Sequence, residues 1–184
     1  MGNEMKRCII LGSAPVEDGG IFDRFDAQDA FLICADGGMD TARKYGVQPN
    51  LLIGDFDSMQ GSLPDGIETI RLKPEKDDTD LLAAVREGLQ RGYREYILLG
   101  ALGGERFDHS YANLCVLQFL AHEGCRAVLA EKGTYIFLLR EGQTEPLLQL
   151  RGADFPRGVS NRILSDQAAV TVHQGEMLGI VYQP

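Results

Sequence analysis

The chain has 184 residues, 44% of them hydrophobic, which suits one globular domain or one domain with a small appendage. Its 27 acidic residues outnumber its 18 basic residues and give a formal net charge of -9, which argues against a nucleic-acid-binding surface. No apolar run reaches the roughly 18 residues that a transmembrane helix needs, and the N-terminal apolar run is too short for a secretory signal. We therefore expect a soluble cytoplasmic protein that binds neither nucleic acid nor membrane.

Short apolar runs alternate with helical patterns over the first two thirds of the chain. Six partly β-branched runs predict buried parallel strands at residues 8–11, 31–34, 51–53, 67–72, 96–99 and 126–129. Amphipathic patterns predict helices over residues 39–45, 80–90 and 108–122, which end near Gly46, Gly92 and Gly124. Because strands alternating with helices form right-handed crossovers, we predict an α/β fold with an open, mostly parallel, Rossmann-like sheet and flanking helices.

The pattern changes after residue 131. Residues 135–139, 147–150, 169–173 and 177–182 are predicted to form strands with no helices between them, and Gln174-Gly175 is predicted to form a hairpin turn. We therefore divide the chain into an α/β domain, residues 1–131, and a small antiparallel β domain, residues 132–184.

The four cysteines lie mostly inside apolar runs and show no CxxC spacing. Free cysteine in such surroundings behaves as a small hydrophobic residue. We expect Cys8, Cys34, Cys115 and Cys125 to be reduced core residues, with Cys115 on the buried face of the third predicted helix together with Ala112, Val116 and Phe119.

Four acidic clusters follow the predicted strands or open the predicted helices. They are Ala35-Asp36-Gly37-Gly38, Gly54-Asp55-Phe56-Asp57-Ser58, Asp77-Asp78-Thr79-Asp80, and residues 103–109 with Asp108. Ligands of an open α/β sheet bind beyond the carboxyl ends of its strands, so the clusters are expected to meet at one edge. Carboxylates this close repel one another unless they share a cation, and Mg²⁺ selects hard oxygen ligands together with substrate phosphates. The sequence therefore predicts a metal and phosphate site.

The first metal candidates are Asp55 and Asp57. In an extended segment, side chains two residues apart point the same way and can reach one ion. Asp77, Asp78 and Asp80 gather at a helix N-terminus, where one of them could serve as N-cap. Three carboxylates exceed that structural need, which favours Asp80 as a metal ligand and the neighbouring Thr79 as a hydroxyl donor.

The last cluster combines a glycine pair with charged side chains. Gly103-Gly104 lets the backbone approach an anion, and the helix start that follows supplies free N–H groups. Arg106 adds a guanidinium suited to phosphate. Asp108 either contacts a nucleotide or caps its helix, and His109 either positions a phosphate or forms a local hydrogen bond. Because no P-loop, GxGxxG, HExxH, GxSxG or zinc-binding pattern is present, a nucleotide would be held by a different arrangement.

Five motifs in this order resemble bacterial thiamine pyrophosphokinases. They are the three clusters at Asp36, Asp55 and Asp80, then Gly103-Gly104 with Arg106-Phe107-Asp108-His109, and finally Gly158-Val159-Ser160-Asn161. The resemblance implies transfer of the pyrophosphoryl group of ATP to the hydroxyethyl oxygen of thiamine, giving thiamine diphosphate and AMP. It further implies a homodimer with thiamine sites between subunits, and a C-terminal β-sandwich, here shortened between Arg140 and Phe155.

The resemblance also assigns roles to individual residues. Asp55, Asp57 and Asp80 would be the Mg²⁺ ligands, and together with Arg106 they would form the catalytic set. The nucleotide-binding set would be Asp36, Gly37, Asp77, Asp78, Thr79, Gly103, Gly104, Asp108 and His109. Ser160 and Asn161 would contact the pyrimidine ring of thiamine.

Three other functions are compatible with the same residues. The chain could pyrophosphorylate another hydroxymethyl heterocycle, such as a pterin. It could be a non-catalytic sensor that binds thiamine diphosphate or a nucleotide, although such a sensor would not need the metal-binding carboxylates. It could also be a metal-dependent phosphohydrolase that releases phosphate without any acceptor.

Overall fold

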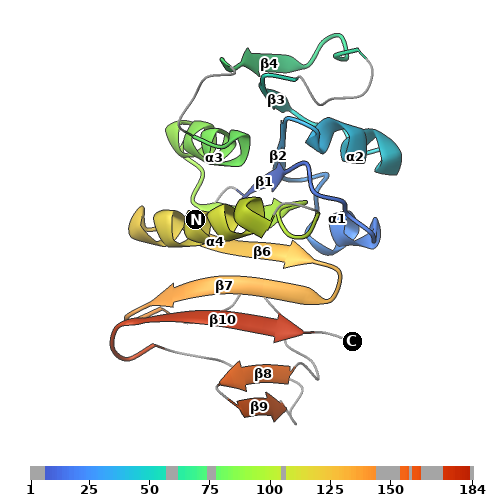
Figure 1. Cartoon of the computed structure of the whole chain (residues 1–184). Helices are drawn as coiled ribbons and strands as arrows, with labels where there is room; N and C mark the ends of the chain where they lie inside the picture. The colour runs from blue at the N-terminus through green and yellow to red at the C-terminus, as the bar shows by residue number, and fades with distance from the viewer. Residues whose placement is uncertain are drawn as a thin grey trace.

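Figure 1 shows a computed structural model of the chain, which describes residues 7–56, 62–73, 78–104, 107–143, 154–157, 159–162 and 172–182. The six predicted parallel strands are confirmed. They are β1 (Arg7–Leu11), β2 (Phe31–Ala35), β3 (Leu51–Gly54), β4 (Glu68–Arg71), β5 (Glu95–Leu99) and β6 (Arg126–Glu131). In the sheet they lie in the order β4-β3-β2-β1-β5-β6, so that Cys8 of β1 pairs with Phe31 on one side and Tyr96 on the other.

Four helices connect these strands: α1 (Gly20–Arg24), α2 (Gly38–Tyr45), α3 (Asp80–Gln90) and α4 (Phe107–His122). The three predicted helices begin within one residue of the expected positions and end as expected. Gly46 has a φ of 67°, the left-handed conformation of a helix C-cap. The remaining helix, α1, has only five residues, too few to give a hydrophobic period in the sequence.

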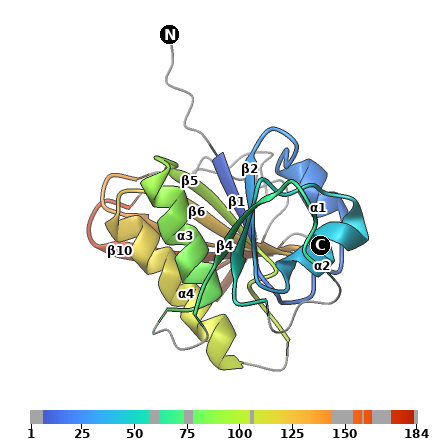
Figure 2. The same ribbon diagram turned by 90° about the horizontal axis from the view of Figure 1, so that it is seen from above.

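The helices cover both faces of the parallel sheet. Seen from above, α1 and α2 lie on one side of the strands and α3 and α4 on the other (Figure 2). Because side chains alternate along a strand, Ile9 and Leu11 pack toward α1 and α2, whereas Cys8 and Ile10 pack toward α3 and α4. The sheet is therefore the middle layer of a three-layer α/β structure.

Strand β4 is not buried, so the prediction of a buried strand at residues 67–72 is wrong in that respect. It forms the edge of the sheet, where Glu68, Thr69 and Arg71 are exposed and Ile70 is partly covered. Charged side chains on an edge strand discourage pairing with another chain.

The strands after residue 131 continue the same sheet. β7 (Thr134–Arg140) pairs antiparallel with β6, and β10 (Glu176–Tyr182) pairs antiparallel with β7. β8 (Asp154–Arg157) and β9 (Val159–Arg162) extend the order to β6-β7-β10-β8-β9 (Figure 1). The described residues thus form one sheet of ten strands. The predicted antiparallel strands at residues 135–139 and 177–182 are confirmed, whereas a separate β-sandwich is not.

The other strands and the turn predicted after residue 131 are described only in part. The strand predicted at residues 147–150 lies outside the described residues, as does most of the one at 169–173, of which Val172 and His173 are not in a strand. Gln174-Gly175 lies in the bend before β10. Neither β8 nor β9 is predicted by the sequence pattern, and β9 contains Ser160 and Asn161.

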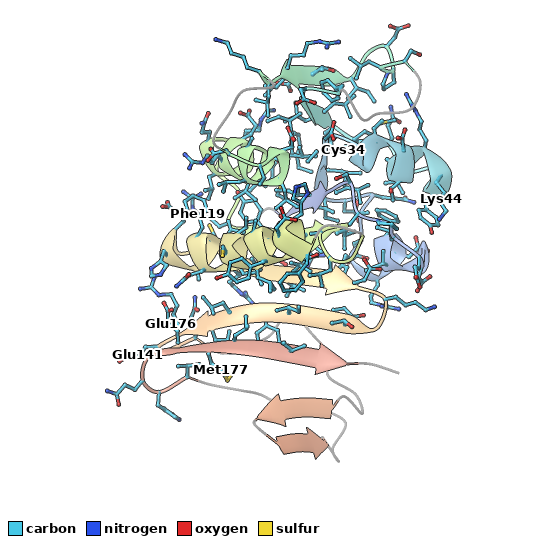
Figure 3. All side chains as sticks on the ribbon, in the orientation of Figure 1. Cys34, Lys44, Phe119, Glu141, Glu176 and Met177 are labelled. Atoms are coloured by element: carbon cyan, nitrogen blue, oxygen red, sulfur yellow. The ribbon has the colours of Figure 1, made fainter. Side chains whose placement is uncertain are left out.

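Three of the four cysteines are core residues, as predicted, but Cys115 is exposed. Cys34 lies among closely packed side chains of the interior (Figure 3), and burial raises the pKa of its thiol to about 12. Burial also raises the pKa of Cys8, so both side chains remain neutral thiols.

The predicted buried face of α4 is wrong because the helix is apolar around most of its circumference. Its buried residues are Val116, Leu117, Leu120 and Ala121, whereas Ala112 and Phe119 are only partly buried. Within the described residues, neither α4 nor any other helix is long and apolar enough to cross a membrane.

Candidate active site

The strand order places a topological switch point beside β1 at the carboxyl edge of the sheet. From β1 the chain moves outward through β2, β3 and β4, and then returns to the other side of β1 with β5. The chain after β1 therefore leads to α1 on one face of the sheet, whereas the chain after β5 leads to α4 on the other face (Figure 2). Such a switch point is where open α/β sheets bind ligands. The predicted acidic clusters follow β2, β3, β4 and β5, so their described parts do lie along this edge.

Glycines hold the loops of this edge against one another. The amide of Gly12 donates to the carbonyl of Leu99 at 2.8 Å, and the amide of Ala14 donates to that of Gly100 at 2.9 Å. A Cβ atom at Gly12 would lie 2.5 Å from the Gly100 oxygen, and one at Gly38 would lie 2.1 Å from the Leu11 oxygen. Any residue larger than glycine at position 12 or 38 would clash with these carbonyl oxygens. The loops after β1, β2 and β5 therefore lie in direct contact with one another.

Asp36 occupies the middle of this edge. Its amide donates to the Ile53 carbonyl at 2.9 Å, and a Cβ atom at Gly54 would lie 3.0 Å from the Asp36 Cα. The φ of Asp36 is 46°, which is a left-handed backbone conformation. For a residue with a side chain this conformation costs on the order of 1 kcal/mol or more, and residues that adopt it are concentrated at functional sites. The next residue, Gly37, packs against Ser13, since a Cβ atom at Gly37 would lie 3.1 Å from the Ser13 Cβ.

The segment after β3 is not extended. Phe56, between Asp55 and Asp57, has a φ of 63°. The segment is therefore not extended at Phe56, contrary to the prediction, and strand alternation gives no argument for the relative direction of the two carboxylates. Asp55 is at the carboxyl edge as predicted, and Asp57 lies outside the described residues.

Thr79, rather than an aspartate, is the N-cap of α3. Its hydroxyl accepts a hydrogen bond from the Leu82 amide at 3.2 Å. Asp78 instead forms an ion pair with Arg86, 3.1 Å between carboxylate oxygen and Nε. Asp80 is in the first turn of the helix, where a negative charge is favourable, and Asp77 lies outside the described residues.

Contacts of α3 with the β1 loop bring its first turn toward the switch point. A Cβ atom at Gly12 would lie 3.2 Å from Cδ1 of Leu81, the residue that follows Asp80. The predicted candidates Asp36, Asp55 and Asp80 therefore come from three elements that end or begin at the same edge.

The loop into α4 has the backbone that the glycine pair predicts. Gly103 and Gly104 have φ values of 81° and 76°, both left-handed. The helix begins at Phe107, so Asp108 lies within its first turn and is not its N-cap, and His109 follows it. Asp108 and His109 are exposed, and Arg106 lies outside the described residues.

Ser160 and Asn161 are not brought to this edge within one chain. They pair with Pro156 and Phe155 in the β8–β9 ladder, at the end of the sheet opposite to β4. Eight strand spacings of ~4.8 Å each separate β9 from β3. The structure therefore divides the predicted site residues into two groups.

The described carboxylates suit Mg²⁺ by chemistry, although they do not form a complete cluster. Within the described ranges, no three His, Cys, Asp or Glu side chains lie close enough together to hold a metal ion. Mg²⁺ is commonly bound by only one or two carboxylates together with waters and substrate phosphates. Asp55 and Asp80, from neighbouring elements of one edge, fit that requirement.

Sequence reasoning missed the contribution of the β1 loop. Gly12-Ser13-Ala14-Pro15 does not match GxGxxG, so no motif assigns it to the site. The exposed Ser13 nevertheless lies at the switch point, next to Gly37. Only the strand order, which places β5 beside β1, could have revealed it.

The fold and the edge together define an α/β protein with an acidic, glycine-rich ligand site at a topological switch point. Residues 22–129, from α1 to β6, match the family model described as thiamin pyrophosphokinase, catalytic domain. The chain therefore belongs to the thiamin pyrophosphokinase family, which confirms the resemblance carried by the motifs and does not favour the alternatives.

Solved structures of similar fold cover nearly all of the chain. Thiamin pyrophosphokinase from Geobacillus thermodenitrificans is 21% identical, with 97% of this chain and 98% of that chain covered and a TM-score of 0.74. The enzyme from Bacillus subtilis is 18% identical, with coverages of 96% and 98% and a TM-score of 0.78. The yeast enzyme is 12% identical, with coverages of 98% and 87% and a TM-score of 0.67. A comparison with curated proteins finds no match.

Proposed function

We propose that the chain is a thiamin pyrophosphokinase, which transfers the pyrophosphoryl group of ATP to the hydroxyethyl oxygen of thiamine and releases AMP. The match of residues 22–129 to the catalytic-domain model carries this proposal. The matched segment includes the loops after β2, β3, β4 and β5, which form most of the acidic edge.

The carboxyl edge is the proposed site of ATP and Mg²⁺. Asp55, Asp57 and Asp80 would hold the Mg²⁺ ion, which when bound neutralises and orients the phosphates. The nucleotide would be held by Asp36, Gly37, Asp77, Asp78, Thr79, Gly103, Gly104, Asp108 and His109. The left-handed Gly103 and Gly104 and the start of α4 support this assignment, because such a turn directs backbone N–H groups toward an anion.

The residues of this edge would act mainly by positioning and charge. In the reaction the thiamine oxygen forms a bond to the β-phosphorus, while the bond from that phosphorus to the oxygen bridging to the α-phosphate breaks and AMP leaves. Arg106 would stabilise negative charge that develops on the transferred group. The thiazolium cation of thiamine suits an acidic edge, and an aspartate of the cluster would accept the hydroxyl proton late in the transfer.

We further propose a homodimer in which thiamine binds between subunits. The separation within one chain supports this proposal, because Ser160 and Asn161 are eight strand positions from β3 and a second copy could bring the two groups together. The start of α4 supports this arrangement, because Phe107 and Tyr111 are 80% and 61% exposed beside the glycine pair, and a partner could cover them. Residues 132–184 would then be the thiamine-binding part of the chain. Since the reaction consumes ATP, we place the enzyme in the cytoplasm.

The nucleotide product separates this proposal from its alternatives. The protein is incubated with Mg²⁺ and ATP, with and without thiamine, and the nucleotides are separated by chromatography. AMP that forms only with thiamine is the expected result. Formation of ADP, or of AMP at a rate that thiamine does not change, would contradict the proposal. A parallel reaction with a hydroxymethylpterin in place of thiamine is expected to yield no AMP.

A further inference from the structure

We propose that Arg71 is an additional phosphate-binding residue for the nucleotide and that Phe56 positions it. The proposal rests on the proposed function, because it assumes that ATP binds at the carboxyl edge. Arg71 belongs to none of the acidic clusters and to none of the motifs that carry the family resemblance.

The sheet places Arg71 beside the predicted metal ligands. Arg71 is the last residue of β4 and pairs with Gly54, the last residue of β3. The amide of the next residue, Leu72, donates to the Gly54 carbonyl at 2.9 Å, which continues this pairing beyond the strand. Since Asp55 directly follows Gly54, the backbones of Arg71 and Asp55 lie at the same edge, one strand apart.

The ring of Phe56 holds the guanidinium of Arg71. The central guanidinium carbon lies 5.6 Å from the ring centroid, within the range of a cation–π contact. Ile70 packs toward α3 and α4, so the alternation along β4 directs Arg71 to the opposite face, where Phe56 packs against the core.

Phe56 makes this contact from a costly backbone conformation. A φ of 63° is rare for a bulky residue and is retained where the surrounding structure requires it, most often at functional sites. The strand geometry of β3 therefore does not continue through Phe56, and the ring lies beside Arg71. We infer that the turn serves to place a cation next to the acidic cluster.

The charge state of Arg71 suits an anionic ligand. The side chain is exposed, and within the described part of the chain it forms no ion pair with a carboxylate. Arg86 on α3, by contrast, is already paired with Asp78. A guanidinium with its donors available binds phosphate oxygens in a bidentate manner, whereas it would repel a metal ion or a thiazolium ring. Of the proposed ligands, only the phosphates of ATP match it.

The direct test measures ATP binding in the presence of Mg²⁺ and the absence of thiamine, by titration calorimetry. Arg71→Met is expected to raise the dissociation constant of ATP about tenfold, and to raise the KM for ATP similarly while leaving the KM for thiamine unchanged. Arg71→Lys, which keeps the charge and loses the planar fork, is expected to give an intermediate loss. Arg94→Met is the matched control, because Arg94 is also exposed but lies just before β5, at the amino ends of the parallel strands and away from the proposed site. Binding of ATP by Arg71→Met as tightly as by the unsubstituted protein would overturn the proposal.

The role of Phe56 is tested by a double-mutant cycle on the same measurement. Phe56→Leu is expected to weaken ATP binding less than Arg71→Met does, and Phe56→Tyr to preserve it, because tyrosine retains the aromatic face. The double variant Phe56→Leu, Arg71→Met is expected to bind ATP no more weakly than Arg71→Met alone. Fully additive losses would show that Phe56 does not act through Arg71.

Failure of the proposed function would give a different result from failure of this inference. If the unsubstituted protein binds ATP but forms no thiamine-dependent AMP, the proposed reaction is wrong, while the comparison of Arg71→Met with Arg94→Met still decides the role of Arg71. If the unsubstituted protein does not bind ATP, both are overturned.

Discussion

Two residues at the carboxyl edge of the sheet have an unusual backbone conformation. Three non-glycine residues of the described chain have a positive φ: Asp26, Asp36 and Phe56. Two of them, Asp36 and Phe56, lie within two residues of the ends of β2 and β3. Since such conformations persist only where the fold requires them, they support a functional role for this edge independently of the sequence motifs.

Asp55→Asn is expected to lower kcat at least ~100-fold, because an amide is a much poorer ligand for Mg²⁺ than a carboxylate. The protein should remain folded, as judged by circular dichroism and thermal unfolding. Asp57→Asn is expected to behave in the same way. Asp29→Asn is the matched control, because Asp29 is exposed before β2 at the opposite edge. Asp55→Asn activity within tenfold of the unsubstituted protein would refute the metal assignment.

At the scale of elements, three helices begin at the edge where the site is proposed. α2 starts after Gly37, α3 after the cap Thr79, and α4 three residues after Gly104. Helix N-termini carry unsatisfied N–H groups and partial positive charge, which favour phosphate. Because the strands are parallel, all three helices point their N-termini toward this edge. The edge thus offers N–H groups for phosphate as well as carboxylates that would hold the cation.

Thr79→Ala is expected to reduce the free energy of unfolding by ~1 kcal/mol, because the Leu82 amide loses its acceptor. If Thr79 also contacts the nucleotide, the KM for ATP rises in the same variant. Thr79→Ser keeps the hydroxyl and should match the unsubstituted protein in both respects. Denaturant unfolding and steady-state kinetics measure the two effects. An unchanged unfolding midpoint for Thr79→Ala would contradict the capping role.

How far the elements could be predicted depends on the length of their patterns. The period of the leucines and Val85 predicts α3, and the aspartate cluster before it and Gly92 after it mark its ends. Helix α1, with five residues, is shorter than any detectable period. The apolar residues of α4 do not indicate which face is buried, and for this reason the prediction that Cys115 is a core residue is wrong. Burial of β4 depends on its position at the sheet edge, and the local sequence of a strand does not specify its neighbours.

At the scale of the whole molecule, the sheet continues from the α/β part into the C-terminal strands. β7 pairs with β6 along the Val128 to Phe137 register, so the change of pattern at residue 131 is not accompanied by a new sheet. Alternating sequence patterns are the same whether a strand starts a second sheet or extends the first, which is why the pattern predicts a separate β domain. The order of motifs predicted which loops share an edge, but the separation of Ser160 from that edge follows only from the strand order.

The proposed sharing of the thiamine site between two subunits predicts complementation. Asp55→Asn and the double variant Ser160→Ala, Asn161→Ala are each expected to be inactive. When equal amounts are unfolded together and refolded, half of the dimers are mixed, and each mixed dimer has one intact site, so about a quarter of the original activity should return. Separately refolded samples provide the control. If activity does not return although mixed dimers form, the thiamine site lies within one subunit.

The most direct test of the central claim follows the β-phosphorus of ATP. The protein is given thiamine, Mg²⁺ and ATP carrying a radioactive label at that phosphorus, and the products are separated. We expect the label in thiamine diphosphate, with unlabelled AMP formed in equal amount. Label that appears in ADP or in inorganic pyrophosphate, with none in thiamine diphosphate, would contradict the assignment of this chain as a thiamin pyrophosphokinase.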